Sequence, residues 1–389
     1  MATPKLRFKE FDGYLEKNNL INLTLWASGG TPSKKNKDYW MGDIPLISGA
    51  SMHTRKICES EFNITDLGLK KGSKLAPKNS ILILVRGSML FKKIPMGMAL
   101  KDVAFNQDVK SIITKEDLNE YYFFQWLLSQ ENIIQNKVTS TGIGAGKLDT
   151  SELQNLEIYY PAKEEQTKIA TFLSAVDTKI DELTQKHELL TEYKKGMMQQ
   201  LFSQKLRFQA DDGSDFEDWE YMSLHEVLDY EQPTRYIVKT TDYDDSFKTA
   251  VLTAGKSFIL GYTNEDNDIF EADNKNVIIF DDFTTAYKFV DFPFKVKSSA
   301  MKILQTKSKN YDIFYIYSVF STINIQKGDE HKRRWISEYS QIEVPIPSLP
   351  EQTKIANFLT AIDQKIDNVA EQIDHAKTWK KGLLQQMFV

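Results

Sequence analysis

The sequence lacks the features that secreted proteins and membrane proteins usually carry. Its 389 residues include one cysteine, Cys58, so no internal disulfide can form, which fits a reducing cytoplasm. No apolar run reaches the ~18 residues that would span a bilayer. The charged start, residues 1–11, is not followed by the apolar stretch of a signal peptide. We therefore expect a cytoplasmic protein that makes no contact with a membrane.

Metal-ligand spacings and catalytic motifs are missing as well. The five histidines are scattered and, with one cysteine, match no metal-binding pattern. Residues 250–257 resemble a phosphate-binding loop, but Ala250 stands at the first glycine position, and residues 142–147 are glycine-rich without dinucleotide-binding spacing. Asp281 and Asp282 are adjacent, so in a strand they would point to opposite faces, and we expect them in a turn or at the surface. The sequence predicts no metal, no cofactor and no catalytic residue in this chain.

What the sequence does contain is an internal repeat. Residues 165–202 and 351–388 align without a gap, and 19 of the 38 aligned positions are identical, which chance does not explain. Alternating steps of four and three residues select apolar positions in both segments, a pattern typical of a coiled-coil seam between two long helices. The residues predicted for this seam are Ile169, Leu173, Val176, Ile180, Leu183, Leu190, Met197, Ile355, Leu359, Ile362, Ile366, Val369, Ile373 and Leu383.

A second, shorter repeat shows how the two copies are joined. The segment at residues 5–8, Lys-Leu-Arg-Phe, recurs at residues 205–208, directly after the first helix. The repeating unit therefore continues from the C-terminus back to the N-terminus. This circular organisation predicts that the two helices pair antiparallel about a pseudo-two-fold axis.

Each long helix follows a mixed α/β region, which we call a head. Strand-like runs at residues 80–85 and 276–280, with helical patterns at 115–128 and near 311–321, place the heads in the α/β class. The heads share little sequence with each other, unlike the helices, which indicates a shared framework with variable heads. The predicted division is residues 1–161 for the first head, 162–204 for the first helix, 205–347 for the second head and 348–389 for the second helix.

The charge is negative overall but locally basic. The net charge of −5 argues mildly against a protein covered by nucleic acid. Residues 67–100, however, contain no acidic side chain, and residues 283–310 contain one among six lysines. A solvated surface is the alternative for either stretch. Lysines suit phosphate contacts, and Arg, Ser and Thr can read base edges, so the candidate DNA contacts are Lys34, Lys35, Lys37, Arg86, Lys92, Lys93, Thr234, Arg235, Lys256, Lys297, Ser298, Lys302, Arg333 and Arg334.

Several motifs together resemble the specificity subunit of a type I restriction-modification enzyme. The resemblance covers nearly the whole chain. Its most specific parts are the two proline-to-helix junctions, at residues 161–173 and 347–359, and the opening of the first head. The remaining parts are in the second head, at residues 252–263, 278–285 and 292–304.

The resemblance implies partners rather than catalysis. Each head would read one half of a bipartite, asymmetric target in double-stranded DNA, and the helices would set the spacer and bind two modification subunits. Those subunits would carry S-adenosylmethionine and methylate adenine, while restriction subunits would use ATP and Mg to translocate and cleave DNA. Residues 250–257 would then belong to a recognition domain. The alternative is a coiled-coil scaffold whose heads bind other proteins.

Overall fold

The computed structural model describes residues 3–141, 144–253, 258–323 and 334–389, and the chain forms two compact units. Unit 1 comprises Met1–Thr184 and Ala370–Val389, and unit 2 comprises Gln185–Val369. Each unit contains one α/β head and a part of each long helix. Among the described residues, no helix combines the length and apolar character that crossing a membrane requires.

The head of unit 1 is built around two main sheets, as expected for the α/β class. The five-stranded sheet has the order β2 (Thr24–Ser28), β11 (Val109–Thr114), β7 (Ile81–Leu84), β9 (Met96–Ala99) and β4 (Lys56–Ile57). The four-stranded sheet has the order β5 (Asn63–Ile64), β3 (Trp40–Ile47), β10 (Val103–Phe105) and β6 (Lys74–Ala76). The predicted strand at residues 80–85 is β7, and all four of its side chains are buried.

Short elements complete this head. The minor sheets pair β1 (Glu16–Asn19) with β14 (Glu157–Tyr160), and join β12 (Thr139–Ser140), β13 (Gly146–Lys147) and β8 (Arg86–Gly87). The helices are α1 (Leu20–Leu23), α2 (Asp66–Gly72), α3 (Glu120–Ser129), α4 (Glu131–Gln135), α5 (Thr150–Gln154) and the 3₁₀ turns η1 (Lys37–Tyr39), η2 (Gly49–Ser51) and η3 (Ser88–Phe91).

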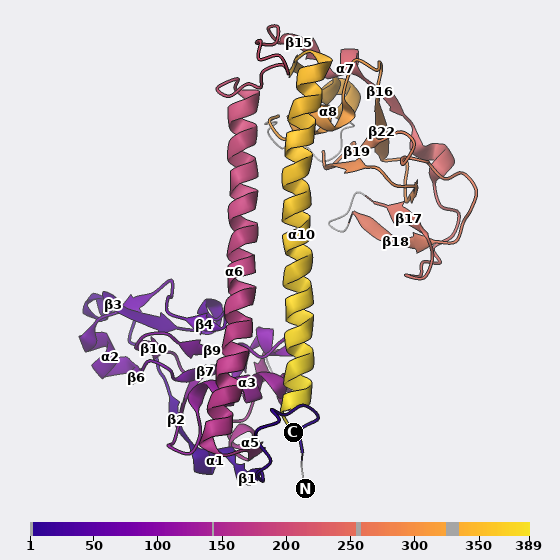
Figure 1. Ribbon diagram of the computed structural model, residues 1–389. Coiled ribbons are helices and arrows are strands. Elements are labelled where there is room, and N and C mark those ends of the chain that lie inside the picture. Colours follow the sequence, from indigo (N-terminus) through magenta and orange to yellow (C-terminus); the bar gives the residue numbers. More distant parts are fainter. Residues whose placement is uncertain (1–2, 142–143, 254–257, 324–333) are drawn as a thin grey trace. The chain divides into compact units, whose positions relative to one another are not determined.

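Helix α3 begins later than the helix predicted at residues 115–128. The Asn119 side chain accepts hydrogen bonds from the backbone N–H groups of Tyr121 and Tyr122, which fixes the helix start at Glu120. Its Phe123 and Trp126 lie in the same core as the strands of the five-stranded sheet. Figure 1 shows α3 beside the first half of the long helix α6.

The head of unit 2 has comparable content in a different arrangement. Its sheets are β16 (Leu228–Glu231), β22 (Met301–Thr306), β19 (Val277–Asp281) and β20 (Tyr287–Val290); β18 (Ile259–Thr263), β17 (Thr249–Leu252) and β21 (Phe294–Val296); and the pair β15 (Glu220–Ser223) and β23 (Glu343–Ile346). Its helices are α7 (Leu224–Val227), α8 (Ile313–Phe320), α9 (Arg334–Ser337), η4 (Pro233–Tyr236) and η5 (Tyr339–Gln341). The predicted strand at 276–280 and helix near 311–321 correspond to β19 and α8.

The expectation that Both side chains are almost fully buried, with 3% and 2% exposed. The Asp281 carboxylate accepts the Thr284 N–H and hydroxyl in the turn after β19, and the Asp282 carboxylate accepts the Trp335 N–H. Buried carboxylates are stable here because each one has hydrogen-bond donors, which the sequence pattern does not reveal.

The repeated segments form the long helices α6 (Lys163–Phe202) and α10 (Leu349–Met387). In unit 1 the start of α6 shares a hydrophobic core with the end of α10, through Leu173 and Leu383. In unit 2 the end of α6 shares a core with the start of α10, through Leu201 and Leu359. Within each unit the two helices therefore pair antiparallel, as predicted. All fourteen residues predicted for the seam are buried or half-buried.

Two lysines interrupt the apolar seam, and each has an acidic partner on the other helix. In unit 1 the Lys380 ammonium donates to Asp177 at 2.5 Å. In unit 2 Lys194 donates to both Asp363 oxygens at 2.6 Å. The two pairs are related by the sequence repeat, and such paired polar groups in a seam favour one register of the helices.

The short repeat at residues 5–8 and 205–208 closes the end of one long helix in each unit. The Leu6 N–H donates to the Gln386 carbonyl near the end of α10, and the Leu206 N–H donates to the equivalent Gln200 carbonyl of α6. The ring of Phe8 packs edge-on against Phe172 at 5.7 Å. The corresponding rings in unit 2 are 5.6 Å apart. These matching contacts agree with the circular organisation predicted from the sequence.

The repeated Glu-Gln dipeptide at the start of each helix joins that helix to its own head. In unit 1 Glu165 binds Arg7, while the Gln166 side chain accepts the Asn119 N–H before α3 and donates to the Asp117 carbonyl. Unit 2 repeats both contacts: Glu351 binds Arg207, and Gln352 accepts the Asp312 N–H before α8 and donates to Asn310. The identical residues of the repeat therefore include the joint between helix and head.

Candidate nucleic-acid interface

Four cationic side chains gather on the head of unit 1. Lys110 of β11 donates to the Ser28 hydroxyl at 2.6 Å, and its pKa is lowered by burial and then by the charges of Arg86 and Lys74, against a smaller opposite effect of Asp108. Arg86 lies opposite Lys147 in the pairing of β8 with β13. We call Lys74, Arg86, Lys110 and Lys147 the cationic cluster. Its mutual repulsion would be relieved by an anion such as a DNA phosphate.

The lysine-rich loop predicted to bind DNA starts near this cluster. A Cβ atom on Gly72 would lie 2.4 Å from the Pro32 Cα, so the loop backbone is in contact with the turn that precedes Lys74. Lys34, Lys35 and Lys37 follow Pro32, and all three are exposed. The Trp40 ring N–H donates to the Ser33 carbonyl and holds the loop against β3. The loop therefore presents its lysines to solvent on a defined backbone.

The other predicted contacts of unit 1 are exposed but not all are gathered. Arg86 is part of the cationic cluster. Lys92 and Lys93 follow η3 and point to solvent, and among the described residues no contact joins them to the cluster. They stay candidates on exposure and charge alone.

In unit 2 the predicted contacts are spread over three elements. Thr234 and Arg235 are exposed on η4, where Arg235 pairs with Asp268 at 3.0 Å. Lys297 is half-buried, with its ammonium 3.3 Å from the Tyr243 hydroxyl. Ser298 is exposed beside it. Lys256 and Arg333 lie outside the described residues.

Two predicted contacts in unit 2 are buried. Lys302 is 1% exposed, 3.4 Å from the Asp282 carboxylate and 4.8 Å from the centre of the Tyr230 ring. Arg334 is 4% exposed at the start of α9. A phosphate cannot approach a side chain enclosed in this way, so neither residue is positioned as a surface DNA contact.

Sequence reasoning missed most of the cationic cluster. Lys74 was visible in the acid-free stretch, but Lys110 and Lys147 come from distant strands that only the sheet pairing brings together. Lys110 stands in an otherwise β-forming run, Val109 to Thr114, where one charged residue is usual on an exposed face. The available signal was therefore weak.

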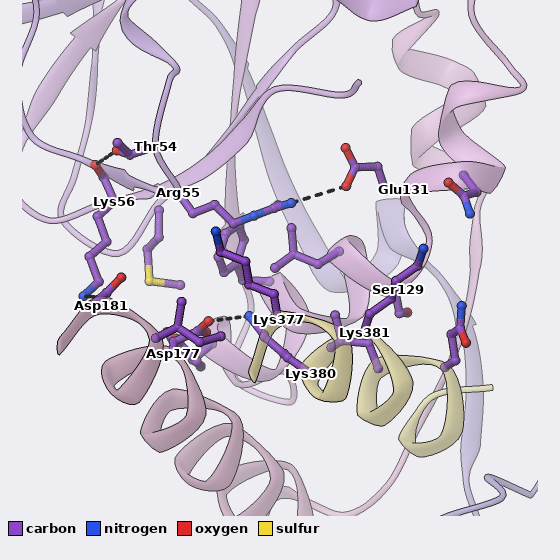
Figure 2. Close-up of a pocket in the computed structure, with 18 of the residues that line it drawn as sticks. Thr54, Arg55, Lys56, Ser129, Glu131, Asp177, Asp181, Lys377, Lys380 and Lys381 are labelled. Carbon is purple, nitrogen blue, oxygen red and sulfur yellow. Dashed lines mark hydrogen bonds and ion pairs between the residues drawn. The ribbon is translucent and has the colours of Figure 1, made fainter. Parts of the chain in front are cut away.

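A groove accompanies the long helices in each unit. The unit 1 groove, of about 810 Å³, has Lys377, Lys380 and Lys381 of α10 on one side and α3 on the other. The unit 2 groove, of about 700 Å³, has the repeat-equivalent Thr191, Lys194 and Lys195 of α6 on one side and α8 on the other. Figure 2 shows the unit 1 groove, with Lys380 directed at Asp177 and Arg55 paired with Glu131. The helix side of the groove is repeated, whereas the head side is not.

The described part of the chain offers no metal site. No three His, Cys, Asp or Glu side chains in it come together as a possible set of ligands. The arrangement that the structure does show is suited to binding anions and other macromolecules through exposed cations and grooves.

Comparison with known proteins gives one consistent result. The chain is 50% identical over 150 residues to the EcoR124I/EcoR124II specificity subunit of a type I restriction enzyme from Escherichia coli, a match that covers 36% of this chain and 37% of that one. It is 26% identical over 396 residues to the MjaIX specificity subunit from Methanocaldococcus jannaschii, covering 93% and 89%. The S subunit of a type I system from M. genitalium has the same fold, with a TM-score of 0.66 at 18% identity over 100% of this chain and 99% of that one.

A family model covers both halves of the chain. The type I restriction modification DNA specificity domain matches residues 19–192 and again residues 216–377. Each match contains one head and most of the long helix that follows it. The chain therefore belongs to the family of type I restriction modification DNA specificity domains.

Proposed function

We propose that this chain gives a type I restriction-modification complex its DNA sequence specificity, with each head reading one half of a bipartite, asymmetric target. The observation that carries the proposal is the contrast between the two parts of each unit. The helix joints made by Glu165 and Glu351 are the same, whereas the exposed cations of the two heads lie on different elements. Identical joints with different heads suit a protein that binds two different half-sites in one way.

The DNA contacts divide by chemistry. In unit 1 the cationic cluster and the exposed lysines at positions 34, 35, 37, 92 and 93 are proposed to bind phosphates, because lysine and arginine in this setting position a protein without reading sequence. In unit 2 Thr234, Arg235 and Ser298 are exposed and carry groups that can read base edges. Lys297, Lys256 and Arg333 remain proposals of the same kind.

The long helices are proposed to act as a spacer. Two heads that enter the major groove on one face of the duplex are about one helical turn apart, ~34–36 Å. The lysine–aspartate pairs in the seam, Lys380–Asp177 and Lys194–Asp363, hold the register of the helices on which this spacing would depend.

Two modification subunits are the proposed partners of the helices. Support comes from the two grooves, because repeat-equivalent residues of α6 and α10 line them and two copies of one protein need two similar surfaces. Catalysis would reside in the partners: S-adenosylmethionine in the modification subunits, and ATP and Mg in restriction subunits. This chain would be their non-catalytic subunit in the cytoplasm.

The test combines genome mapping with binding. Methylated adenines in the host genome should define one bipartite motif, and the chain with its modification subunit should shift a duplex carrying that motif. Competition with a duplex in which one half-site is scrambled should fail. A protein scaffold would give a shift without sequence preference, or none, and either result would reject the proposal.

A further inference from the structure

Asp177 connects the head of unit 1 to both long helices at once. Its carboxylate accepts the Lys380 ammonium of α10, and it also accepts the Tyr121 hydroxyl and the Gln125 amide of α3, each at 2.8 Å. Because α3 belongs to the core of the head, these two bonds reach from the recognition head into the helix seam. Burial and the Asp177 charge raise the pKa of the Tyr121 hydroxyl, so it stays a donor at neutral pH.

Unit 2 lacks these two donors at the corresponding positions. The correspondence of α3 with α8 is fixed by three contacts: Asn119 matches Asp312 as the helix cap, Gln166 matches Gln352, and the hydroxyls of Tyr122 and Tyr315 both bind the strand before the long helix. Tyr121 then corresponds to Phe314, which has no polar atom in its side chain. Gln125 corresponds to Ser318, whose hydroxyl donates to its own helix.

One other side chain of unit 2 approaches the equivalent aspartate. Asp363 raises the pKa of Tyr317, a smaller effect than that of burial on the same phenol. Among the described residues, however, no hydrogen bond joins Tyr317 to Asp363. The seam pair is therefore repeated in both units, and the link from head to seam is described in unit 1 alone.

The link is not explained by packing. Gln125 is fully buried, and its carbonyl oxygen has no hydrogen-bond partner among the described residues. A buried amide with one half unpaired costs stability, and a leucine of similar size would avoid that cost. What the glutamine adds is a directional bond to Asp177, which restrains rotation of α3 about the long helices.

We propose that Asp177, through Tyr121 and Gln125, fixes the orientation of the first head on the helix pair and so sets how strictly the complex accepts one spacer length. These three are positioning residues. The inference rests on the proposed function, since spacer length has meaning only for a protein that reads two half-sites. The second head, held by the repeated joint at Gln352 without this link, is the one that adjusts.

The experiment removes the link and keeps the seam pair. The variant Tyr121→Phe/Gln125→Leu leaves Lys380 bound to Asp177, and Phe314→Leu/Ser318→Ala alters the matching positions of unit 2 as a control. Each protein, in complex with its modification subunit, is titrated with duplexes that carry the genomic motif with the natural spacer or with one base pair more or fewer. Thermal unfolding is measured on the same samples.

The expected result separates positioning from stability. Preference for the natural spacer should fall roughly tenfold in the unit 1 variant, the effect of about one hydrogen bond to a charged group, while its unfolding temperature stays the same or rises. The control should keep its spacer preference. Unchanged spacer preference in the unit 1 variant would overturn the inference, and if that variant does not fold, Tyr121→Phe alone decides by the same criterion. A wild-type complex that ignores the half-sites would instead refute the proposed function.

Discussion

Arg7 and Glu165 form a two-pronged ion pair, with the arginine Nε 2.7 Å from one carboxylate oxygen and Nη2 2.6 Å from the other. The Glu165 side chain is 4% exposed and the Arg7 side chain 17%. Removing one member of an enclosed pair leaves an uncompensated charge, so Arg7→Met should lower the free energy of unfolding by about 2–3 kcal/mol. Urea unfolding followed by circular dichroism measures this. Lys17→Met, which breaks the exposed pair with Glu157, is the matched control and should have little effect; equal losses in the two variants would contradict the prediction.

The phosphate contacts proposed for unit 1 can be counted by salt dependence. Each phosphate contact contributes ~0.9 to the slope of log affinity against log salt. Lys34→Ala/Lys35→Ala and Arg86→Ala/Lys110→Ala should therefore each reduce the slope by about two. Fluorescence anisotropy at several salt concentrations gives the slopes. Lys186→Ala, an exposed lysine of α6, should leave the slope unchanged, and a double variant with the wild-type slope would remove that pair from the interface.

The framework of this protein could be predicted because its signals are local and repeated. The heptad pattern from Ile169 and from Ile355 depends on spacing along one helix, and the structure confirms antiparallel pairing in both units. The start of α3 could not be placed as well, because it depends on the Asn119 cap and on Gln166, a contact 47 residues away. Local patterns determine helices, whereas long-range contacts determine their ends.

The candidate site was harder to predict for the same reason. Lys302 has the charge of a surface residue, but Asp282 and the Tyr230 ring enclose it, and both come from other strands or turns. Conversely, Lys110 joins Arg86 only because β11 and β8 are brought together by the sheets. A sequence lists the charges, while the topology decides which are paired inside and which gather outside.

Arg235 is held by an acidic neighbour that would compete with DNA. Its Nε lies 3.0 Å from Asp268, and this bond lowers the pKa of the Asp268 carboxyl. Because the arginine is exposed, exchange of the carboxylate for a phosphate or a base costs little. Asp268→Asn should strengthen binding to DNA of any sequence roughly two- to threefold, while Arg235→Ala should weaken binding to the specific half-site. Titration of specific and scrambled duplexes distinguishes the two, and no change in either variant would exclude Arg235 from the interface.

Tyr287 makes unit 2 sensitive to high pH. Burial, followed by the neighbouring Tyr317 and Tyr339, raises its pKa from 10.0 to about 12. A raised pKa means that the contribution to stability is complete below pH 10 and is lost as the pH rises towards 12. Tyr287→Phe should therefore lose less stability between pH 8 and 11 than the wild type, by ~1 kcal/mol after allowance for partial exposure. Urea unfolding at both pH values tests this. Tyr14→Phe, at an 85% exposed ring, should follow the wild type, and so would Tyr287→Phe if the phenol were not shielded.

The spacer role of the helices predicts what lengthening them would do. Four residues inserted after Leu190 in α6 and four after the repeat-equivalent Ala376 in α10 would add ~6 Å to each helix. That is a little more than one turn, so the apolar seam would stay nearly in phase. The preferred spacer should then grow by roughly two base pairs at ~3.4 Å each, with both half-sites unchanged, because the inserted residues touch neither head. Methylated adenines mapped in cells that carry the lengthened chain would report both quantities together. Altered half-site sequences with the original spacer would show that the helices do not measure distance, and inserting the four residues in α6 alone should weaken the seam rather than shift the spacer cleanly.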